Sequence, residues 1–305
     1  NRVLISVILV LVIAGTGCSK VQETVTVTTP ALELPTVSTD VGTVREVNLG
    51  LATVDLGVGI NRFAFGIIDS NSKPVRVPTA KATFMYIETT PFEIRAIATA
   101  HFSTWPTGRA GVYVAKDVHL DQEGRWGLLV EVETDDGIVE VGQLGFDVKS
   151  KTSSIEIGSS PPAIQNKTSA SVLSLSEITT STDPDPDLYQ LTIADAIKLA
   201  KPTVISFSTP AFCTTATCGP QIEVISAVKE HYQGEASFIH IEIYDNLLEM
   251  KGDLSKGIIS PIVQEWGLIS EPYTFILDDQ GVIKFKFEGF VTEKELELAL
   301  AELLG

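Results

Sequence analysis

The sequence predicts two domains, an all-β sandwich followed by an α/β domain, and three observations support this division. Between residues 41 and 149, apolar residues recur at every second position, the period of half-buried strands. From residue 188 to residue 305, strand-like runs alternate with segments of helical periodicity. Residues 150–187 lie between these patterns and are rich in Ser, Thr and Pro, so we expect them to be a linker.

The composition is that of a globular protein that does not bind nucleic acid. The chain has 305 residues, enough for about two domains, and 44% of them are hydrophobic. Its formal net charge of -17 creates a field that repels nucleic acid and anionic membrane surfaces. We therefore expect no nucleic-acid partner.

The first residues have the pattern of an export signal. Residues 3–17 are all apolar or small, and Cys18 follows them. A helix of this length spans roughly 22 Å, short of the roughly 30 Å hydrocarbon core of a membrane. We therefore expect residues 1–17 to be a signal peptide that is removed. The ending 14–18 resembles the lipobox of bacterial lipoproteins, except at Gly15, where a large aliphatic residue is usual.

That resemblance implies that Cys18 is lipidated and anchors an extracytoplasmic protein to the cell membrane. The alternative is an ordinary signal peptide followed by an incidental cysteine. A lone exposed thiol is a liability in an oxidising compartment, which favours lipidation. Residues 18–40, rich in Thr, Val, Pro and Ser, are then the lipidated N-terminus and an extended tether.

A β-hairpin is the clearest element of the predicted sandwich, residues 41–149. Trp126, Leu128, Val130 and Val132 share one face of a strand, and a turn at 135–137 leads into a second strand. Further strand-like runs lie at 63–68, 82–87 and 111–115. Together these short strands favour an immunoglobulin-like sandwich.

Two short runs, 59–63 and 124–126, resemble bacterial extracytoplasmic sandwich domains of the copper-resistance and YtkA-like kind. His101 and His119 are the histidines of this domain. A metal site normally needs three or four converging donors, so we expect both to be surface or packing residues.

The C-terminal domain, residues 188–305, has predicted elements in the order helix, strand, cysteine turn, helix, strand, helix, strand, strand, helix. Thr192 begins the first helix, and residues 203–207 are a β-branched run suited to a buried strand. Thr292 and Glu295 form a capping box for the last helix.

The turn between the first strand and the second helix holds Cys213 and Cys218. Because Cys18 has a separate explanation, these two cysteines remain as a potential redox couple. A thiol pair at a strand-to-helix turn is a common site of disulfide exchange.

This order of elements resembles the thioredoxin fold over about residues 188–305. The resemblance includes Pro202 before the first core strand, Pro272 before the third and Gly289 before the final helix. Closest in style are extracytoplasmic members that serve disulfide handling and cytochrome maturation. The resemblance implies that Pro272 is cis, faces the cysteines and forms one wall of the peptide-substrate site.

The cysteine motif departs from the family pattern Trp-Cys-x-x-Cys. Phe212 stands in place of Trp, and four residues separate the cysteines. On an uninterrupted helix, residues five apart are about 140° around the axis and more than about 7 Å apart, too far for a relaxed disulfide. Cys213 must therefore lie in the loop with Cys218 near the helix start, or the turn must bulge.

The cysteine motif can be aligned with the family pattern in two ways. In the first, Cys213 is the attacking thiolate and Cys218 the resolving thiol. In the second, Cys218 attacks and Gln221 replaces its partner. We prefer the first because it keeps both thiols.

Side chains that could activate a thiol are scarce. No Arg follows Arg125, and the nearest lysines in sequence are Lys201 and Lys229. Glu271 precedes the expected cis-proline, and a carboxylate close to the couple would raise a thiol pKa. Ser206 lies roughly where many family members keep a buried proton-relaying Asp. The unpaired N–H groups and the dipole of the following helix would stabilise a thiolate.

The sequence thus predicts a membrane-tethered extracytoplasmic thiol:disulfide oxidoreductase. Its partners would be thiols and disulfides of exported proteins and a redox partner that the sequence does not identify. The alternative is a non-catalytic binding or scaffold lipoprotein in which the cysteine pair is a permanent structural disulfide.

Two further classes share this fold. A peroxiredoxin needs a Thr where this chain has Pro210, and an Arg that this domain lacks, so we expect no peroxidase activity. A copper-delivery protein of the Sco type needs a downstream His, whereas His231 and His240 lie on less suitable elements and none follows them. No nucleotide loop, zinc cluster or Ser-His-Asp set stands out, and we expect no cofactor and no metal.

Overall fold

The computed structural model describes residues 44–105, 108, 111–134, 137–213 and 217–305. The predicted signal peptide, Cys18 and the tether lie outside the described residues. Within the described residues, no helix is both long enough and apolar enough to cross a membrane.

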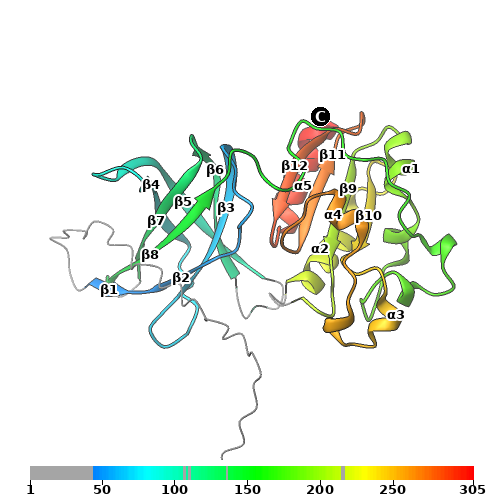
Figure 1. Ribbon diagram of the computed structural model, residues 1–305, viewed down its shortest axis with the longest axis horizontal. Coiled ribbons are helices and arrows are strands. Elements are labelled where there is room, and N and C mark those ends of the chain that lie inside the picture. The colour runs from blue at the N-terminus through cyan, green and yellow to red at the C-terminus, as the bar shows by residue number, and fades with distance from the viewer. Residues whose placement is uncertain (1–43, 106–107, 109–110, 135–136, 214–216) are drawn as a thin grey trace, which may run out of the picture. The chain divides into compact units, whose positions relative to one another are not determined.

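The N-terminal part is all β, as predicted. Its strands are β1 (Val44–Glu46), β2 (Asn48–Leu51), β3 (Gly59–Ile68), β4 (Thr79–Tyr86), β5 (Glu93–Thr104), β6 (Gly111–Leu120), β7 (Gly124–Glu133) and β8 (Val139–Val148). They are hydrogen-bonded in the order β1-β8-β7-β4-β5-β6-β3-β2 (Figure 1). β7 and β8 pair antiparallel, which confirms the predicted hairpin. β1 runs parallel to β8, and the other neighbouring pairs are antiparallel.

Strand β5 joins all eight strands into one hydrogen-bonded network. It pairs with β4 over most of its length, and its last residues, from His101 onward, also pair with β6. An immunoglobulin-like sandwich has two separate sheets instead. A period-two pattern determines which face a residue occupies but not which strands pair, so the sequence could not predict this continuity.

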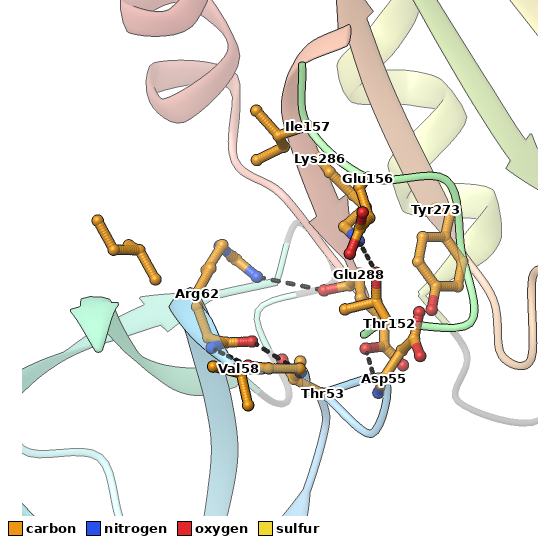
Figure 2. A pocket seen from close by; sticks show the side chains of 13 residues that line it. Thr53, Asp55, Val58, Arg62, Thr152, Glu156, Ile157, Tyr273, Lys286 and Glu288 are labelled. Atoms are coloured by element: carbon orange, nitrogen blue, oxygen red, sulfur yellow. Dashed lines mark hydrogen bonds between the residues drawn. The ribbon is translucent and has the colours of Figure 1, made fainter. Parts of the chain in front are cut away.

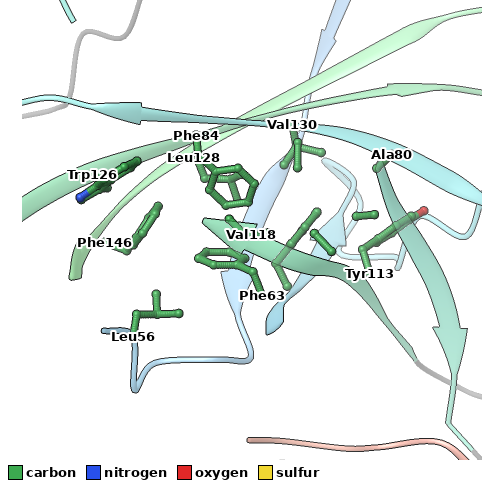
Figure 3. Packing of buried hydrophobic residues seen from close by; sticks show 14 of the residues in the cluster. Leu56, Phe63, Ala80, Phe84, Tyr113, Val118, Trp126, Leu128, Val130 and Phe146 are labelled. Carbon is green, nitrogen blue, oxygen red and sulfur yellow. The ribbon is translucent and has the colours of Figure 1, made fainter. Parts of the chain in front are cut away.

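The core of the N-terminal part is aromatic (Figure 3). The Phe63 ring lies 5.0 Å from the rings of both Phe84 and Phe146, measured between centroids. Trp126 and Leu128, predicted to share a face, are both fully buried. Edge-to-face pairs of this kind contribute roughly 0.5–1.5 kcal/mol beyond the area that they bury.

The C-terminal part contains a four-stranded sheet with the topology of the thioredoxin fold. Its strands are β9 (Thr203–Ser208), β10 (Ser237–Glu242), β11 (Tyr273–Leu277) and β12 (Ile283–Glu288), in the order β10-β9-β11-β12. β10 is parallel to β9, whereas β11 is antiparallel to both β9 and β12. This parallel pair followed by an antiparallel hairpin is the order that the resemblance implied. The C-terminal part therefore has a thioredoxin-like fold.

Helices cover both faces of this sheet. They are α1 (Ile193–Lys198), α2 (Cys218–His231), α3 (Leu247–Met250), α4 (Pro261–Glu265) and α5 (Glu293–Leu304). Val204 of β9 packs in one cluster with α2 and α5, while Ile205 and Phe207 pack in another with α1 and α4. Thr192 caps α1, and the predicted capping box begins α5.

Residues 150–187, expected to be a linker, pack against the C-terminal sheet, and we call them the strap. The strap and the residues just after it contain the short 3-10 helices η1 (Ser169–Ser171), η2 (Leu175–Glu177) and η3 (Pro186–Tyr189), and η4 (Leu254–Lys256) lies farther along the chain. Ile178 joins the cluster of α2 and α5, and Ile155 and Ile164 pack against the other. These apolar residues are isolated among polar ones, so they form no period from which packing could be predicted.

Candidate redox site

Cys213 and Cys218 are joined by a disulfide, with 5.8 Å between their Cα atoms. Cys213 lies in the loop after β9, and Cys218 is the first residue of α2. The helix does not extend back to Cys213, which agrees with the spacing argument. Residues 214–216 lie outside the described residues.

The two cysteines differ in exposure. Cys213 is partly exposed, whereas Cys218 is completely buried at the start of the helix. A sulfur from another protein therefore reaches Cys213 more readily than Cys218, which favours the first register. Gln221, the partner in the rival register, is also buried, and its Oε1 accepts a hydrogen bond from the backbone N–H of Val291 at 2.8 Å.

The carboxylate of Glu271 lies beside the buried sulfur. Its Oε2 is 3.5 Å from Cys218 Sγ and accepts a hydrogen bond from the backbone N–H of Thr209 at 2.8 Å. Burial raises the pKa of Glu271 to about 7, helped by the nearby Glu242 carboxylate and opposed by the Thr209 N–H. An acid of this pKa exchanges its proton readily near neutral pH.

Pro272 is buried, and the Glu271–Pro272 peptide bond is cis, as the resemblance implied. The carbonyl of Pro272 accepts a hydrogen bond from the N–H of Gly289 at 2.8 Å. The cis-proline loop therefore carries the carboxylate that faces Cys218 and is attached to the loop that follows β12.

Glu242, at the end of β10, is a second buried carboxylate near the site. Its Oε2 accepts hydrogen bonds from the N–H and the hydroxyl of Thr180, at 2.8 and 2.9 Å. The Thr180 hydroxyl also accepts from the N–H of Ala211, in the loop that precedes Cys213, at 3.1 Å. Burial raises the pKa of Glu242. Neither Thr180 nor Glu242 was predicted from the sequence, although a carboxylate at the end of a largely apolar strand was a visible signal for Glu242.

His240 is buried beneath the site. Its Nδ1 lies 2.8 Å from the hydroxyl of Tyr189, and its Nε2 lies 3.0 Å from the carbonyl oxygen of Ser208. Burial lowers the pKa of His240 to about 4, so the ring is neutral near pH 7. Ser206, at the expected position of a relaying Asp, is fully buried with its Oγ 3.5 Å from Thr274 Oγ1.

The other histidines lie on the surface. His101 and His119 are exposed, and His231 Nδ1 lies 2.8 Å from a carboxylate oxygen of Glu297.

Three donors at the site could hold a metal ion after reduction. The sulfurs of Cys213 and Cys218 and a carboxylate oxygen of Glu271 lie within 4.8 Å of one another. Two thiolates and one carboxylate supply three of the four ligands of a tetrahedral zinc site. The disulfide and a metal ion exclude each other, because the same sulfurs would make both.

A polar cavity of about 350 Å³ lies between the N-terminal strands and β12 (Figure 2). Glu288 Oε2 accepts from the N–H of Asp55 at 2.8 Å, and the Asp55 carboxylate accepts from the N–H groups of Ser153 and Ser154 at 2.7 and 2.9 Å. Burial alone would raise the pKa of Asp55, but the hydrogen bond from the Ser154 hydroxyl, together with these backbone bonds, holds it below the usual value.

The cations of this cavity are also hydrogen-bonded. Lys286 Nζ donates to Thr152 Oγ1 at 2.8 Å, and Arg62 Nε donates to Glu295 Oε1 at 3.1 Å. Because these charged groups are hydrogen-bonded within the protein, we interpret the cavity as a structural junction.

No family model matches this chain, and no curated protein matches it. The solved structures to which it is similar include a thiol:disulfide interchange protein of the thioredoxin family from Chlorobium tepidum TLS. That structure is 16% identical, and the match covers 38% of this chain and 86% of the other, with a TM-score of 0.30.

Two further solved structures are each similar to about a third of the chain. StoA from Bacillus subtilis is 14% identical, with 32% of this chain and 81% of that chain covered and a TM-score of 0.26. CopC from Methylosinus trichosporium OB3b is 10% identical, with 34% and 93% covered and a TM-score of 0.23. All three TM-scores lie below 0.5, so the fold assignment rests on the strand order and pairing described above.

Proposed function

We propose that this protein is a thiol:disulfide oxidoreductase that exchanges disulfides with exported proteins through Cys213. The observation that carries the proposal is the asymmetry of the pair. A partly exposed sulfur is bonded to a buried one, and a carboxylate with a pKa near 7 lies 3.5 Å from the buried sulfur.

The exchange proceeds in two steps. A substrate thiolate attacks Cys213 Sγ, the Cys213–Cys218 bond breaks, and Cys218 leaves as a thiolate that takes a proton from Glu271. A second substrate thiol then attacks the substrate sulfur of the mixed disulfide, and its proton passes to the departing Cys213 sulfur, so that the substrate is oxidised and the pair is reduced. In the opposite direction, Cys213 attacks a substrate disulfide and Glu271 removes the proton from Cys218.

The N-terminus of α2 provides positive potential for the leaving thiolate. Lys229 cannot provide it, because its ammonium group is held by Asp185 and Asp187, at 2.9 and 2.8 Å. We assign Pro272 the role of positioning the backbone of the substrate, as the resemblance implies.

The cellular setting is part of the proposal. We infer that the chain is exported, lipidated at Cys18 and tethered outside the cytoplasm. The apolar residues 3–17 followed by Cys18 support this inference. We also propose that the N-terminal strands are a variant of the immunoglobulin-like sandwich in which β5 links the two sheets.

The decisive experiment equilibrates the full chain in graded thiol/disulfide buffers. Alkylated Cys213 and Cys218 are then counted separately by mass spectrometry, so Cys18 does not interfere. A reversible midpoint between about -120 and -270 mV is expected for a working oxidoreductase. A midpoint below about -300 mV would instead support the alternative, a binding or scaffold protein with a structural disulfide.

A further inference from the structure

An apolar pocket of about 430 Å³ opens beside the disulfide. Thr217 and Glu271 form one end of it, and they are respectively the residue before Cys218 and the residue whose carboxylate faces it. Much of the rest of the lining comes from the N-terminal strands and from Trp105. The pocket therefore joins the redox site to a part of the chain that lies outside the thioredoxin-like fold.

Two paired glycines make this pocket hollow. Gly50 of β2 and Gly66 of β3 are direct partners in the register, and a Cβ built at either one meets no atom within 4 Å. Along the same strand faces, Ala52 and Ala64 are also small, and the N–H of Ala52 bonds to the carbonyl of Ala64 at 2.9 Å.

Large apolar side chains form the walls. Phe290, in the loop after β12, is almost fully buried in the cluster of α2 and α5. Trp105 packs both against that cluster and against the small cluster of Ala64, Val112 and Val114 on β3 and β6. The walls are therefore held by packing on two sides, so that the hollow is already formed before any ligand enters.

We propose that this pocket takes an aliphatic or aromatic side chain of the substrate protein, from a residue directly before or after the substrate cysteine that reacts with Cys213. The proposal rests on the proposed function. An extended chain advances about 3.3 Å per residue, so a segment whose sulfur is at Cys213 carries its neighbouring side chains past Thr217 and Glu271. The apolar lining favours an apolar side chain, and Glu271 at its end disfavours an acidic one.

The test compares short peptides that each contain one cysteine. One pair carries Leu or Ser directly after the cysteine, a second pair carries Leu or Ser directly before it, and glutathione is the small-thiol reference. The measured quantity is the rate constant for opening the disulfide of the full oxidised chain. In at least one pair, the Leu peptide should react on the order of tenfold faster than the Ser peptide, since burying a leucine contributes about 1.5 kcal/mol or more.

Gly66→Leu is the critical variant, because Gly66 lines the pocket and a Cβ at this position meets no atom within 4 Å, so that the larger side chain occupies the hollow. It should abolish the preference for Leu while leaving the glutathione rate unchanged. Thr99→Leu, which places the same bulk at an exposed position of β5, is the matched control and should retain the preference.

Two outcomes overturn the inference separately from the proposed function. They are equal rates for the Leu and Ser peptides in both pairs, or an unchanged preference in Gly66→Leu, each with normal glutathione exchange. The second would also result if another segment of this chain filled the pocket. If neither glutathione nor any peptide opens the disulfide, the proposed function itself fails.

Discussion

Replacing Glu271 with Gln should lower the pKa of the Cys218 thiol by at least about one pH unit. The two groups are 3.5 Å apart, and two unit negative charges at that distance repel by about 5 kcal/mol at an effective dielectric constant of about 20. One pH unit corresponds to about 1.4 kcal/mol, so the upper limit is about three and a half pH units. Glu271 is partly exposed, and solvent screening reduces the effect below that limit.

The assay is the ultraviolet absorbance of the thiolate as a function of pH. It uses a chain in which Cys18→Ser and Cys213→Ser leave Cys218 as the remaining thiol, with Glu or Gln at position 271. Glu297→Gln, which removes a surface carboxylate near His231, is the control and should leave the titration unchanged. Indistinguishable Cys218 pKa values with Glu and Gln at position 271 would refute the assignment of Glu271 as the proton-exchanging group.

Two further predictions concern stability. Burial lowers the pKa of His240 from about 6.5 to about 4, so its neutral ring contributes about 3 kcal/mol above pH 6.5, and this stability is lost as the pH falls from about 6.5 to about 4. Urea unfolding at a series of pH values should show this loss. The free energy of unfolding should fall less steeply between about pH 6.5 and pH 4 in His240→Gln, and an equally steep fall in both proteins would contradict the prediction. Arg62→Met removes the close partner of the buried Glu295 carboxylate and should lower the free energy of unfolding by about 3 kcal/mol. Arg125→Met, which breaks the exposed pair with Asp147, should change it by at most about 1 kcal/mol, and equal losses in the two variants would show that burial of the Arg62 pair is unimportant.

The features that could be predicted from the sequence are those that local sequence patterns determine. Thr192 and Thr292 cap helices where their capping signals lie, and Cys218 begins α2, one of the two arrangements that a disulfide with four intervening residues allowed. The cis bond before Pro272 was implied by resemblance alone. These features depend on neighbours in the chain or on a motif, both of which are visible in one sequence.

What the sequence could not predict depends on contacts between distant residues. Glu271 was predicted to affect the couple only if it lay nearby, and its 3.5 Å separation from the Cys218 sulfur is a property of the folded chain. The hollow beside the disulfide requires Gly50 to pair with Gly66. Neither glycine is distinctive in the sequence, because the register that aligns them is set by the strands around them.

The strap has a consequence for how the chain can be divided. Its Thr180 hydroxyl contacts both Glu242 and the loop that leads to Cys213. A fragment that begins at residue 188 would lack this hydroxyl and would uncover the surface on which Ile178 packs. A fragment that keeps these contacts and the packing of Ile155 therefore begins at or before residue 155, and a protease that cut the strap would disturb the loop before Cys213 without touching either cysteine.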